Sequence, residues 1–470
     1  MWRLRFTRAV LVAVCLCCVL VTAGAARRQE SGLEGYWEGA VTREGKVWRV
    51  TFEITRDGAG AVSGGADKGY RAVADFVDAG GVDRVFTVEF DAPHVRLERP
   101  QPNGAPIVFD GRVAGDRFSG TFSGLGTTAD FTLRRRGSVR PRFYREQAVT
   151  FRNGEVTLSG TLLLPLGKKG PRPAVVFAHG GAPEARLVNK DWALRFVRRG
   201  MAALIYDKRG VGESTGNWRT ANLDELAGDL LAGVRLLKAR RDIDPRRIAA
   251  AGHSQGGTIA PLAAVKSRDI SFVISSAPSA VNYAEQSVYH RANVMRESGL
   301  SEEAVRIASA LRERLYATGR MLLANDPSAE AERRQLSAEL ERYKDAPWLE
   351  AAALPPNLDN DKPSRGGLEL LFFEPLPVWE GLRVPALFLW GDQDTVVPVE
   401  QGRGIIESAQ RRSGNRDYTI KVFPDVTHFT TKSRTRDEGW DFPRVASDYL
   451  EASADWLAAR VNARPSGERP

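Results

Sequence analysis

One serine of the chain has the surroundings of a nucleophile. Ser254 lies in the glycine-rich segment 252–257 (GHSQGG), directly after the apolar run 247–251 and before a stretch with helical character. A sharp turn between a strand and a helix exposes a serine hydroxyl, and it needs small neighbours because the flanking backbones approach closely. The same glycine–serine spacing recurs around Ser214, but there it follows a polar loop and precedes no helix. We therefore predict that Ser254 is the nucleophile and that Ser214 is not.

A serine hydroxyl attacks only when a base removes its proton, and a carboxylate usually orients that base. His428 follows the last strand-like run, 418–423, in a loop at the carboxyl end of a strand. Open α/β sheets carry their chemistry at such loops, so we predict that His428 is the base. We expect His253 to point away from the serine, His179 to brace a loop, and the rest to lie in other regions. These other histidines are His94 and His290.

The acid is expected in the segment 386–398, where an apolar run leads into a turn with Asp392 and Asp394. The resulting order of serine, aspartate and histidine along the chain is that of α/β-hydrolases. At these residues the sequence resembles the α/β-hydrolase superfamily, in which Gly-x-x-Asp-x-x-Val-Pro marks the acid. Asp394 occupies the acid position of this motif, and Asp392 is then a supporting residue of the turn. The matching residues are Gly391, Asp394, Val397 and Pro398.

A further element is the apolar run that ends in His-Gly-Gly at 179–181. Acyl transfer develops a negative oxygen, and each preorganised N–H donor to that oxygen contributes about 3 kcal/mol. We expect the N–H of Gln255, the residue after the nucleophile, to be one donor. The resemblance implies that the N–H of Gly181 is the second. The loop 207–214 (DKRGVGES) also resembles an α/β-hydrolase loop, one with a structural role, so no catalytic residue is predicted there.

Two architectures follow one another along the chain. Between residues 31 and 137, short alternating runs are separated by glycine and aspartate turns, which predicts a small antiparallel all-β domain, a barrel or a sandwich. Its interior could be a filled core or a ligand-binding lumen. Between residues 138 and 462, eight strand-like runs with helical spacing between them predict the mostly parallel eight-stranded sheet of the α/β-hydrolase fold. The basic stretch 134–145 is interpreted as the linker.

The helical pattern changes between residues 280 and 377. Three charge-rich segments, near 283–298, 301–320 and 328–344, predict a helical cap inserted after the sixth strand. Such caps exclude water and shape the substrate pocket. One local conflict concerns Pro261, which falls inside the helix after the nucleophile and is expected to remove a hydrogen bond and kink it.

The first 25 residues have the features of a secretory signal peptide. Three arginines precede the apolar run 9–21, and a small-x-small cleavage site follows at 23–25. We therefore expect export to the periplasm or the medium, and no stable membrane span after cleavage. The three cysteines all lie within this segment, so the mature chain can form no disulfide. They are Cys15, Cys17 and Cys18.

The formal net charge is +9, but the basic residues are spread along the chain and accompanied by 58 acidic residues. This distribution favours solubility over nucleic-acid binding. The sequence contains no glycine-rich phosphate loop, His-Glu-x-x-His motif or Cys/His cluster, so we expect neither a metal nor a cofactor.

These features predict a serine hydrolase that cleaves small-molecule carboxylic esters through an acyl-enzyme. Segment 252–261 resembles a group of secreted bacterial carboxylesterases with an extra N-terminal domain, although the Gly-Ala-Pro-Glu after the oxyanion-loop His-Gly departs from that group. Two alternatives remain open. A serine peptidase would need carboxylates for a substrate ammonium, for which Glu302 and Glu303 are the candidates. The third possibility is a secreted binding protein without catalysis.

Overall fold

The computed structural model describes residues 32–56, 69–101, 104–167, 170–358, 363–432 and 444–462. The chain divides into two compact units, the first made of Met1–Val77 and Asp83–Arg140, the second of Asp78–Val82 and Pro141–Pro470. The predicted signal peptide lies outside the described residues. Within the described ranges, no helix is both long and apolar enough to cross a membrane.

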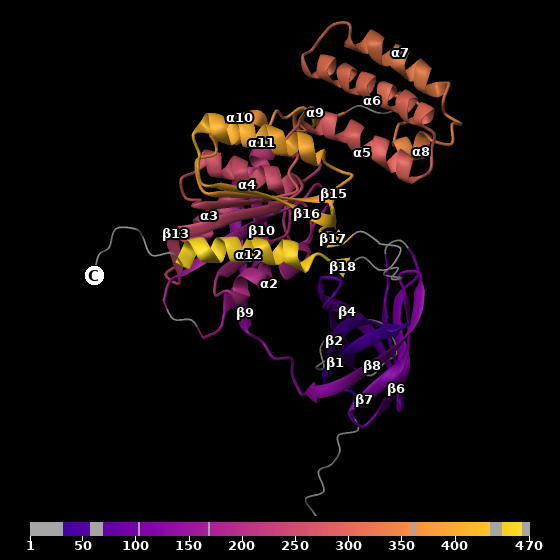
Figure 1. Ribbon diagram of the computed structural model, residues 1–470, viewed down its shortest axis with the longest axis vertical. Coiled ribbons are helices and arrows are strands. Elements are labelled where there is room, and N and C mark those ends of the chain that lie inside the picture. Colours follow the sequence, from indigo (N-terminus) through magenta and orange to yellow (C-terminus); the bar gives the residue numbers. More distant parts are fainter. Residues whose placement is uncertain are drawn as a thin grey trace, which may run out of the picture. The chain divides into compact units, whose positions relative to one another are not determined.

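The first unit is a closed antiparallel barrel of eight strands (Figure 1). Its strands alternate buried and exposed residues, as the sequence pattern predicted, and the inward side chains are a mixture of aromatic and aliphatic ones. Phe109 alone contacts the rings of Phe52, Phe86 and Phe131, so the interior is a packed core. The strands are β1 (Gly35–Arg43), β2 (Lys46–Arg56), β3 (Tyr70–Phe76), β4 (Gly81–Asp91), β5 (His94–Arg99), β6 (Ile107–Ala114), β7 (Arg117–Gly124) and β8 (Thr127–Gly137).

One part of the linker prediction is wrong. The arginines at 134–136 belong to strand β8, where Arg134 pairs with Glu38 and Arg135 with Trp37 of strand β1. The Arg135 guanidinium lies 4.6 Å from the centre of the Trp37 ring. Charged side chains are compatible with a strand whose other face is buried, and a run of arginines gives no apolar signal from which to read it.

The second unit contains one mixed sheet in the order β18-β17-β16-β15-β14-β13-β11-β12-β10-β9. The six central strands, β11 to β16, run parallel, and β10 pairs antiparallel with both of its neighbours, β12 and β9. The eight predicted strands are all present, and two short strands extend the edge. The bounds are β9 (Tyr144–Asn153), β10 (Val156–Pro165), β11 (Arg172–Ala178), β12 (Ala202–Tyr206), β13 (Ile243–His253), β14 (Phe272–Ser276), β15 (Ala386–Gln393), β16 (Tyr418–Thr427), β17 (Thr431–Lys432) and β18 (Arg444–Val445).

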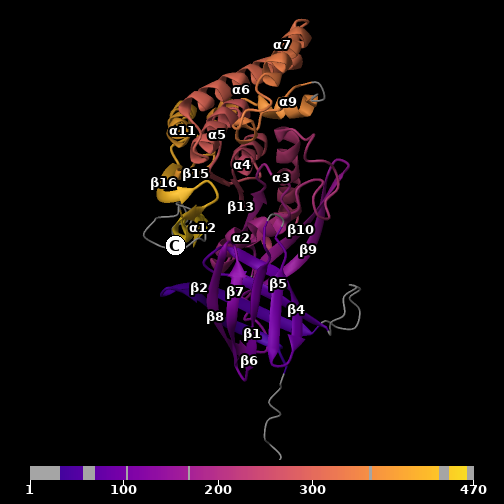
Figure 2. The same cartoon turned by 90° about the vertical axis from the view of Figure 1, so that its right-hand side faces the viewer.

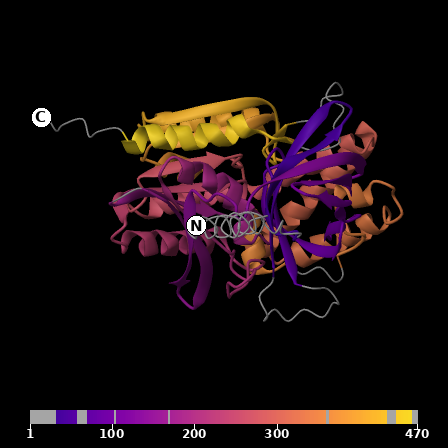
Figure 3. The ribbon, with the colours of Figure 1, turned by 90° about the horizontal axis from the view of Figure 1, so that it is seen from below.

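Helices cover both faces of this sheet. In β11, Val176 packs into a core with α3, α4, α10 and α11, while its neighbour Phe177 packs into a core with α2 and α12. The C-terminal helix α12 is the yellow helix in Figure 3, and its Trp456 Nε1 donates to Thr419 Oγ1 of β16 at 3.2 Å. The helices are α2 (Lys190–Arg198), α3 (Leu223–Lys238), α4 (Gln255–Lys266), α10 (Leu376–Gly381), α11 (Val399–Ser413) and α12 (Ser447–Asn462).

The predicted helical insertion is present between β14 and β15. Helices α5 to α8 contribute to a small core of their own around Leu336 and Leu340, and α5, α6, α7 and α9 lie together in Figure 2. Each of the first three begins after a serine or asparagine, residue types that commonly cap helix N-termini. The helices are α5 (Tyr283–Glu297), α6 (Glu302–Leu323), α7 (Ala329–Glu341), α8 (Leu349–Ala352) and α9 (Arg365–Leu371).

Helix α4 continues through Pro261, and the structure supplies the missing hydrogen bond. A proline nitrogen has no hydrogen to donate to the carbonyl four residues earlier, which here is that of Gly257. The buried Ser275 Oγ of β14 donates to this carbonyl at 2.6 Å. A side chain from the neighbouring strand therefore offsets the bond that Pro261 removes.

Candidate active site

Ser254 occupies the turn between β13 and α4 in a strained conformation, with φ 57° and ψ −119°. Few residues other than glycine adopt such a positive φ, and its cost has to be offset by the surrounding structure. The Ser254 N–H donates to Ser276 O at 2.9 Å, and the Gly257 N–H donates to Ser254 O at 2.8 Å. A Cβ on Gly256 would lie 2.8 Å from Ala178 O, so this position has to be glycine, as the sequence pattern required.

The structure brings Ser254, His428 and Asp394 together from three different strand ends. His428 Nε2 lies 3.0 Å from Ser254 Oγ, and His428 Nδ1 lies 2.8 Å from Asp394 Oδ2. His428 is 6% exposed and Asp394 is 3% exposed, so bulk water has little access to this pair. With the carboxylate accepting from Nδ1–H, the Nε2 lone pair faces the serine hydroxyl, which is the tautomer a general base requires.

The two aspartates of the β15 turn differ in what they contact. Asp394 Oδ1 accepts from the N–H groups of Val396 and Val397 at 2.8 and 2.9 Å, which leaves Oδ2 for the histidine. Asp392 is exposed, and its Oδ1 accepts from the N–H of Asp425 at 2.8 Å. Asp392 therefore supports the loop that leads to His428 and does not contact the histidine in any bond of the described residues.

Helix α5 of the insertion holds the Asp394 turn from outside. Tyr289 Oη donates to Asp394 O at 3.3 Å, and Asn293 Nδ2 donates to Thr395 O at 3.1 Å. His290 Nδ1 lies 3.3 Å from the same Thr395 carbonyl. Side chains of the cap thus hold the backbone of the turn that positions the Asp394 carboxylate. The sequence did not reveal this contact.

His253 precedes the nucleophile and packs beside His428, while the direction of its side chain relative to Ser254 stays a prediction. Its Nδ1 lies 2.9 Å from Ser276 Oγ, and its ring centre lies 4.9 Å from that of His428. Burial, followed by the neighbouring His428, lowers the pKa of His253 to about 3. His253 is therefore neutral at physiological pH, and the His428 imidazole has an uncharged ring beside it.

The predicted oxyanion donors lie at the start of α4 and in the loop after β11. Gln255 is the first residue of α4, so its N–H is one of those that no helical carbonyl satisfies. Gly181 is exposed, and a Cβ there would meet nothing within 4 Å. The loop is braced by Glu184, whose Oε2 accepts from the Gly180 N–H at 2.7 Å and lies 3.6 Å from His179 Nδ1. His179 is buried and its ring centre lies 4.8 Å from that of Tyr206, and its bracing role stays a prediction.

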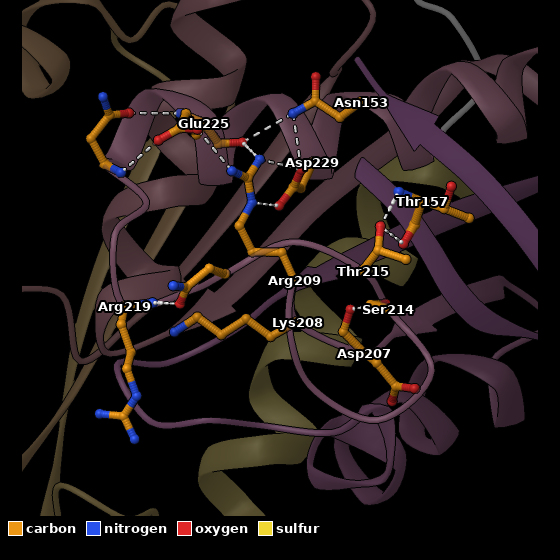
Figure 4. A network of polar contacts seen from close by, with 12 residues as sticks. Asn153, Thr157, Asp207, Lys208, Arg209, Ser214, Thr215, Arg219, Glu225 and Asp229 are labelled. Carbon is orange, nitrogen blue, oxygen red and sulfur yellow. Dashed lines mark hydrogen bonds and ion pairs between the residues drawn. The ribbon is translucent and has the colours of Figure 1, made fainter. Parts of the chain in front are cut away.

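The loop after β12 is mostly structural, as predicted. Arg209 makes a two-point contact with Asp229, at 2.7 and 2.8 Å, and Asp229 is 1% exposed (Figure 4). Ser214 Oγ donates to Asp207 O at 2.7 Å and is buried, so it cannot act as a nucleophile in this conformation. Lys208 is different, because in Figure 4 its side chain extends away from the carboxylates of Asp207 and Asp229.

The acidic pair considered for a peptidase is already engaged at the surface. Glu302 accepts two hydrogen bonds from Arg296, at 2.8 and 3.0 Å, and Glu303 is paired with Arg306 at 2.6 Å. Both carboxylates are exposed, and these arginines lower the pKa of each. Neither glutamate is therefore available in this structure as an ammonium-binding group.

Residues 175–438, more than half of the chain, match the alpha/beta hydrolase family. The chain therefore belongs to this family. Among its relatives is a protein named esterase EstD, from Thermotoga maritima, which is 27% identical over 217 residues. That match covers 44% of this chain and 49% of EstD, so the chain spans about half of the length of that relative.

Two further comparisons extend over more of the chain. The quorum-quenching protein AidA of Acinetobacter baumannii is 25% identical over 306 residues, which cover 64% of this chain and 92% of AidA. The solved structure of the Pyrococcus furiosus esterase Pf2001 is 16% identical with a TM-score of 0.42, covering 67% of this chain and 91% of that one.

Proposed function

We propose that the protein is a serine hydrolase that cleaves carboxylic esters through an acyl-enzyme. The observation that carries this proposal is His428, which bridges Ser254 Oγ at 3.0 Å and Asp394 Oδ2 at 2.8 Å. A serine, an imidazole and a carboxylate linked in this order can transfer the serine proton and orient the base. The family membership and the esterase among the relatives support the same reaction class.

The reaction follows from these contacts. Ser254 Oγ bonds to the substrate carbonyl carbon while its proton moves to His428 Nε2, and the carbonyl π electrons move to the oxygen. We assign the N–H groups of Gln255 and Gly181 as donors to that oxygen. When the carbonyl re-forms, the alkoxide leaves with the proton from His428. Water then repeats these steps on the acyl-enzyme and releases the acid.

An ester substrate is preferred over a peptide on one observation. A peptidase acting at a free amino terminus needs carboxylates directed at the substrate ammonium, and the candidates Glu302 and Glu303 are paired with arginines at the surface. The test is a panel of p-nitrophenyl esters of rising chain length beside aminoacyl p-nitroanilides. We expect ester turnover to exceed anilide turnover, and the opposite ranking would exclude an esterase.

The nucleophile is tested separately with a fluorophosphonate probe. We expect one labelled site, which Ser254→Ala abolishes together with turnover. Ser214→Ala is the matched control, since Ser214 has the same local spacing but a buried hydroxyl, and it should keep both labelling and turnover. Labelling that survives Ser254→Ala would mean that another residue is the nucleophile.

We also propose that residues 1–25 direct export and that the substrate is a small-molecule ester, with no nucleic-acid partner. The basis is the arginine, apolar and small-residue pattern of this segment. Amino-terminal sequencing of the protein recovered from the periplasm and the medium tests the proposal. A first residue near 26 is expected, and an uncleaved cytoplasmic chain would contradict it.

A further inference from the structure

Lys208 places a buried ammonium group beside the loop that carries Gly181. Its side chain belongs to a residue that is 2% exposed, and the Trp218 ring lies 5.2 Å from Nζ. Across the described parts of the chain, no carboxylate lies within ion-pair distance of this group; its hydrogen-bond partners are neutral oxygens. Burying a cation without a carboxylate in direct contact is costly. The positions of these oxygen atoms indicate a functional role for the Lys208 ammonium group.

The first partner is the carbonyl of Gly180, 2.7 Å from Nζ. This carbonyl and the Gly181 N–H belong to one peptide group, and in a planar trans peptide the two point in opposite directions. An ammonium that holds the Gly180 oxygen therefore fixes the direction of the Gly181 N–H. A positive charge on the oxygen side also polarises the amide and strengthens its N–H as a donor.

The other two partners extend the same function. Lys208 Nζ donates to Ala182 O at 3.2 Å, on the other side of Gly181. It also donates to Gln255 Oε1 at 3.2 Å, the side chain of the residue whose N–H is the other proposed donor. The three hydrogen bonds donated by this one ammonium group thus connect the loop after β11 with the first residue of α4.

We propose that Lys208 is the positioning residue of the oxyanion hole and supplies a positive charge to balance the tetrahedral intermediate. This inference rests on the proposed ester hydrolysis at Ser254. In the free enzyme no carboxylate of the described residues lies within ion-pair distance of Lys208 Nζ, and Glu184, which acts on it at longer range, already accepts from the Gly180 N–H. When Ser254 attacks and the carbonyl electrons move to the oxygen, a negative charge forms on the other side of the Gly181 peptide. Lys208 then favours the transition state over the bound ester.

The neighbouring residue gives the contrast. Arg209 is also buried, but its guanidinium is matched by Asp229 and Glu225, and it contacts no part of the oxyanion loop in the bonds of the described residues. Adjacent basic residues therefore have different roles, Arg209 in the stability of the loop and Lys208 in the position of the donors.

The variant Lys208→Met removes the charge and the three hydrogen bonds while keeping a side chain of similar length. We expect kcat for p-nitrophenyl esters to fall about 100-fold, the usual effect of losing one oxyanion donor, with KM changed less than about threefold. The affinity for a trifluoromethyl ketone, which forms a negatively charged adduct with the serine, should fall by a similar factor. Lys190→Met is the matched control, because Lys190 is 3% exposed but pairs with Glu146 at 2.7 Å.

The pH dependence of the wild-type enzyme gives a second readout. Burial lowers the pKa of Lys208 to about 8, against the opposing effect of Glu184. The surroundings also hold the imidazole of His179, beside Glu184, and the guanidinium of Arg219 on the Trp218 ring. Because the cation is lost as the pH rises through about 8, we expect kcat to decline above that pH. In Lys208→Arg this decline should be absent, since a guanidinium remains protonated.

The outcomes separate this inference from the proposed function. If wild-type protein neither reacts with fluorophosphonate at Ser254 nor cleaves esters, the proposed function fails. If it does both, and Lys208→Met is folded by circular dichroism yet keeps wild-type kcat, the inference about Lys208 is wrong. An equal loss of kcat in Lys190→Met would also refute it. Should Lys208→Met fail to fold, a wild-type kcat that stays level between about pH 7 and 10 would overturn the charge role.

Discussion

The exchange of Asp394 for asparagine tests the arrangement around His428 most directly. An asparagine at this position has one oxygen and one NH₂ group, and the structure decides how they are directed. Two backbone N–H groups, of Val396 and Val397, face Oδ1 at 2.8 and 2.9 Å and require an acceptor there. The NH₂ group therefore faces His428 Nδ1, where Oδ2 now lies at 2.8 Å.

This orientation changes the tautomer of the base. Nδ1 must accept from the new NH₂ group, so the imidazole proton moves to Nε2, and Nε2 can no longer accept the proton of Ser254. The same change in a well-studied serine protease lowers kcat about 10⁴-fold. That factor corresponds to about 5.4 kcal/mol of activation free energy, at 1.36 kcal/mol for each tenfold change. We expect a loss of this size in Asp394→Asn.

Asp392→Asn is the control, because it makes the same chemical change two residues away. An asparagine oxygen can still accept from the Asp425 N–H, which lies 2.8 Å from the present carboxylate. We expect kcat within about threefold of wild type, since neither the histidine nor the serine is affected. Both variants are assayed with p-nitrophenyl esters after their folding is confirmed by circular dichroism. The reasoning from the tautomer is refuted if Asp394→Asn keeps more than about a tenth of the wild-type kcat. It is also refuted if Asp392→Asn loses more of its kcat than Asp394→Asn does.

Two further predictions concern stability. Ser275→Ala leaves the buried Gly257 carbonyl without its donor, and should lower the free energy of unfolding, measured in urea, by about 1–3 kcal/mol. Adding Pro261→Ala restores a backbone N–H in the helix and should recover part of this loss. No recovery would contradict the pairing of Ser275 with the Gly257 carbonyl. Arg209→Met leaves Asp229 buried without its guanidinium partner, and should lower the free energy of unfolding in the same urea titration by about 3–5 kcal/mol. We expect kcat of the folded protein to stay near wild type. A loss of kcat without a loss of stability would instead assign Arg209 to the active site.

The sequence determined the local features of this protein because their signals are local. The turn at Ser254 needs glycine at neighbouring positions and follows an apolar strand, and both conditions are visible within ten residues of sequence. Eight of the ten strands of the sheet, and the β-domain, were predictable from hydrophobic runs and alternation, since each of these strands buries one or both faces. The roles of Asp394 and His428 were predicted from chain order and motif, and the structure brings both residues to Ser254.

What the sequence could not determine are contacts between distant segments. Lys208 has its partners at residues 180, 182 and 255, and Ser275 has its partner at 257. No periodicity records such pairs, and the two-residue strands β17 and β18 are too short to leave a pattern. In a parallel sheet the carboxyl ends of separate strands meet at one edge, so loops far apart in the chain share one site. Only the tertiary structure could therefore separate Lys208, directed at the oxyanion loop, from Arg209, directed at Asp229, although the two are neighbours in one motif.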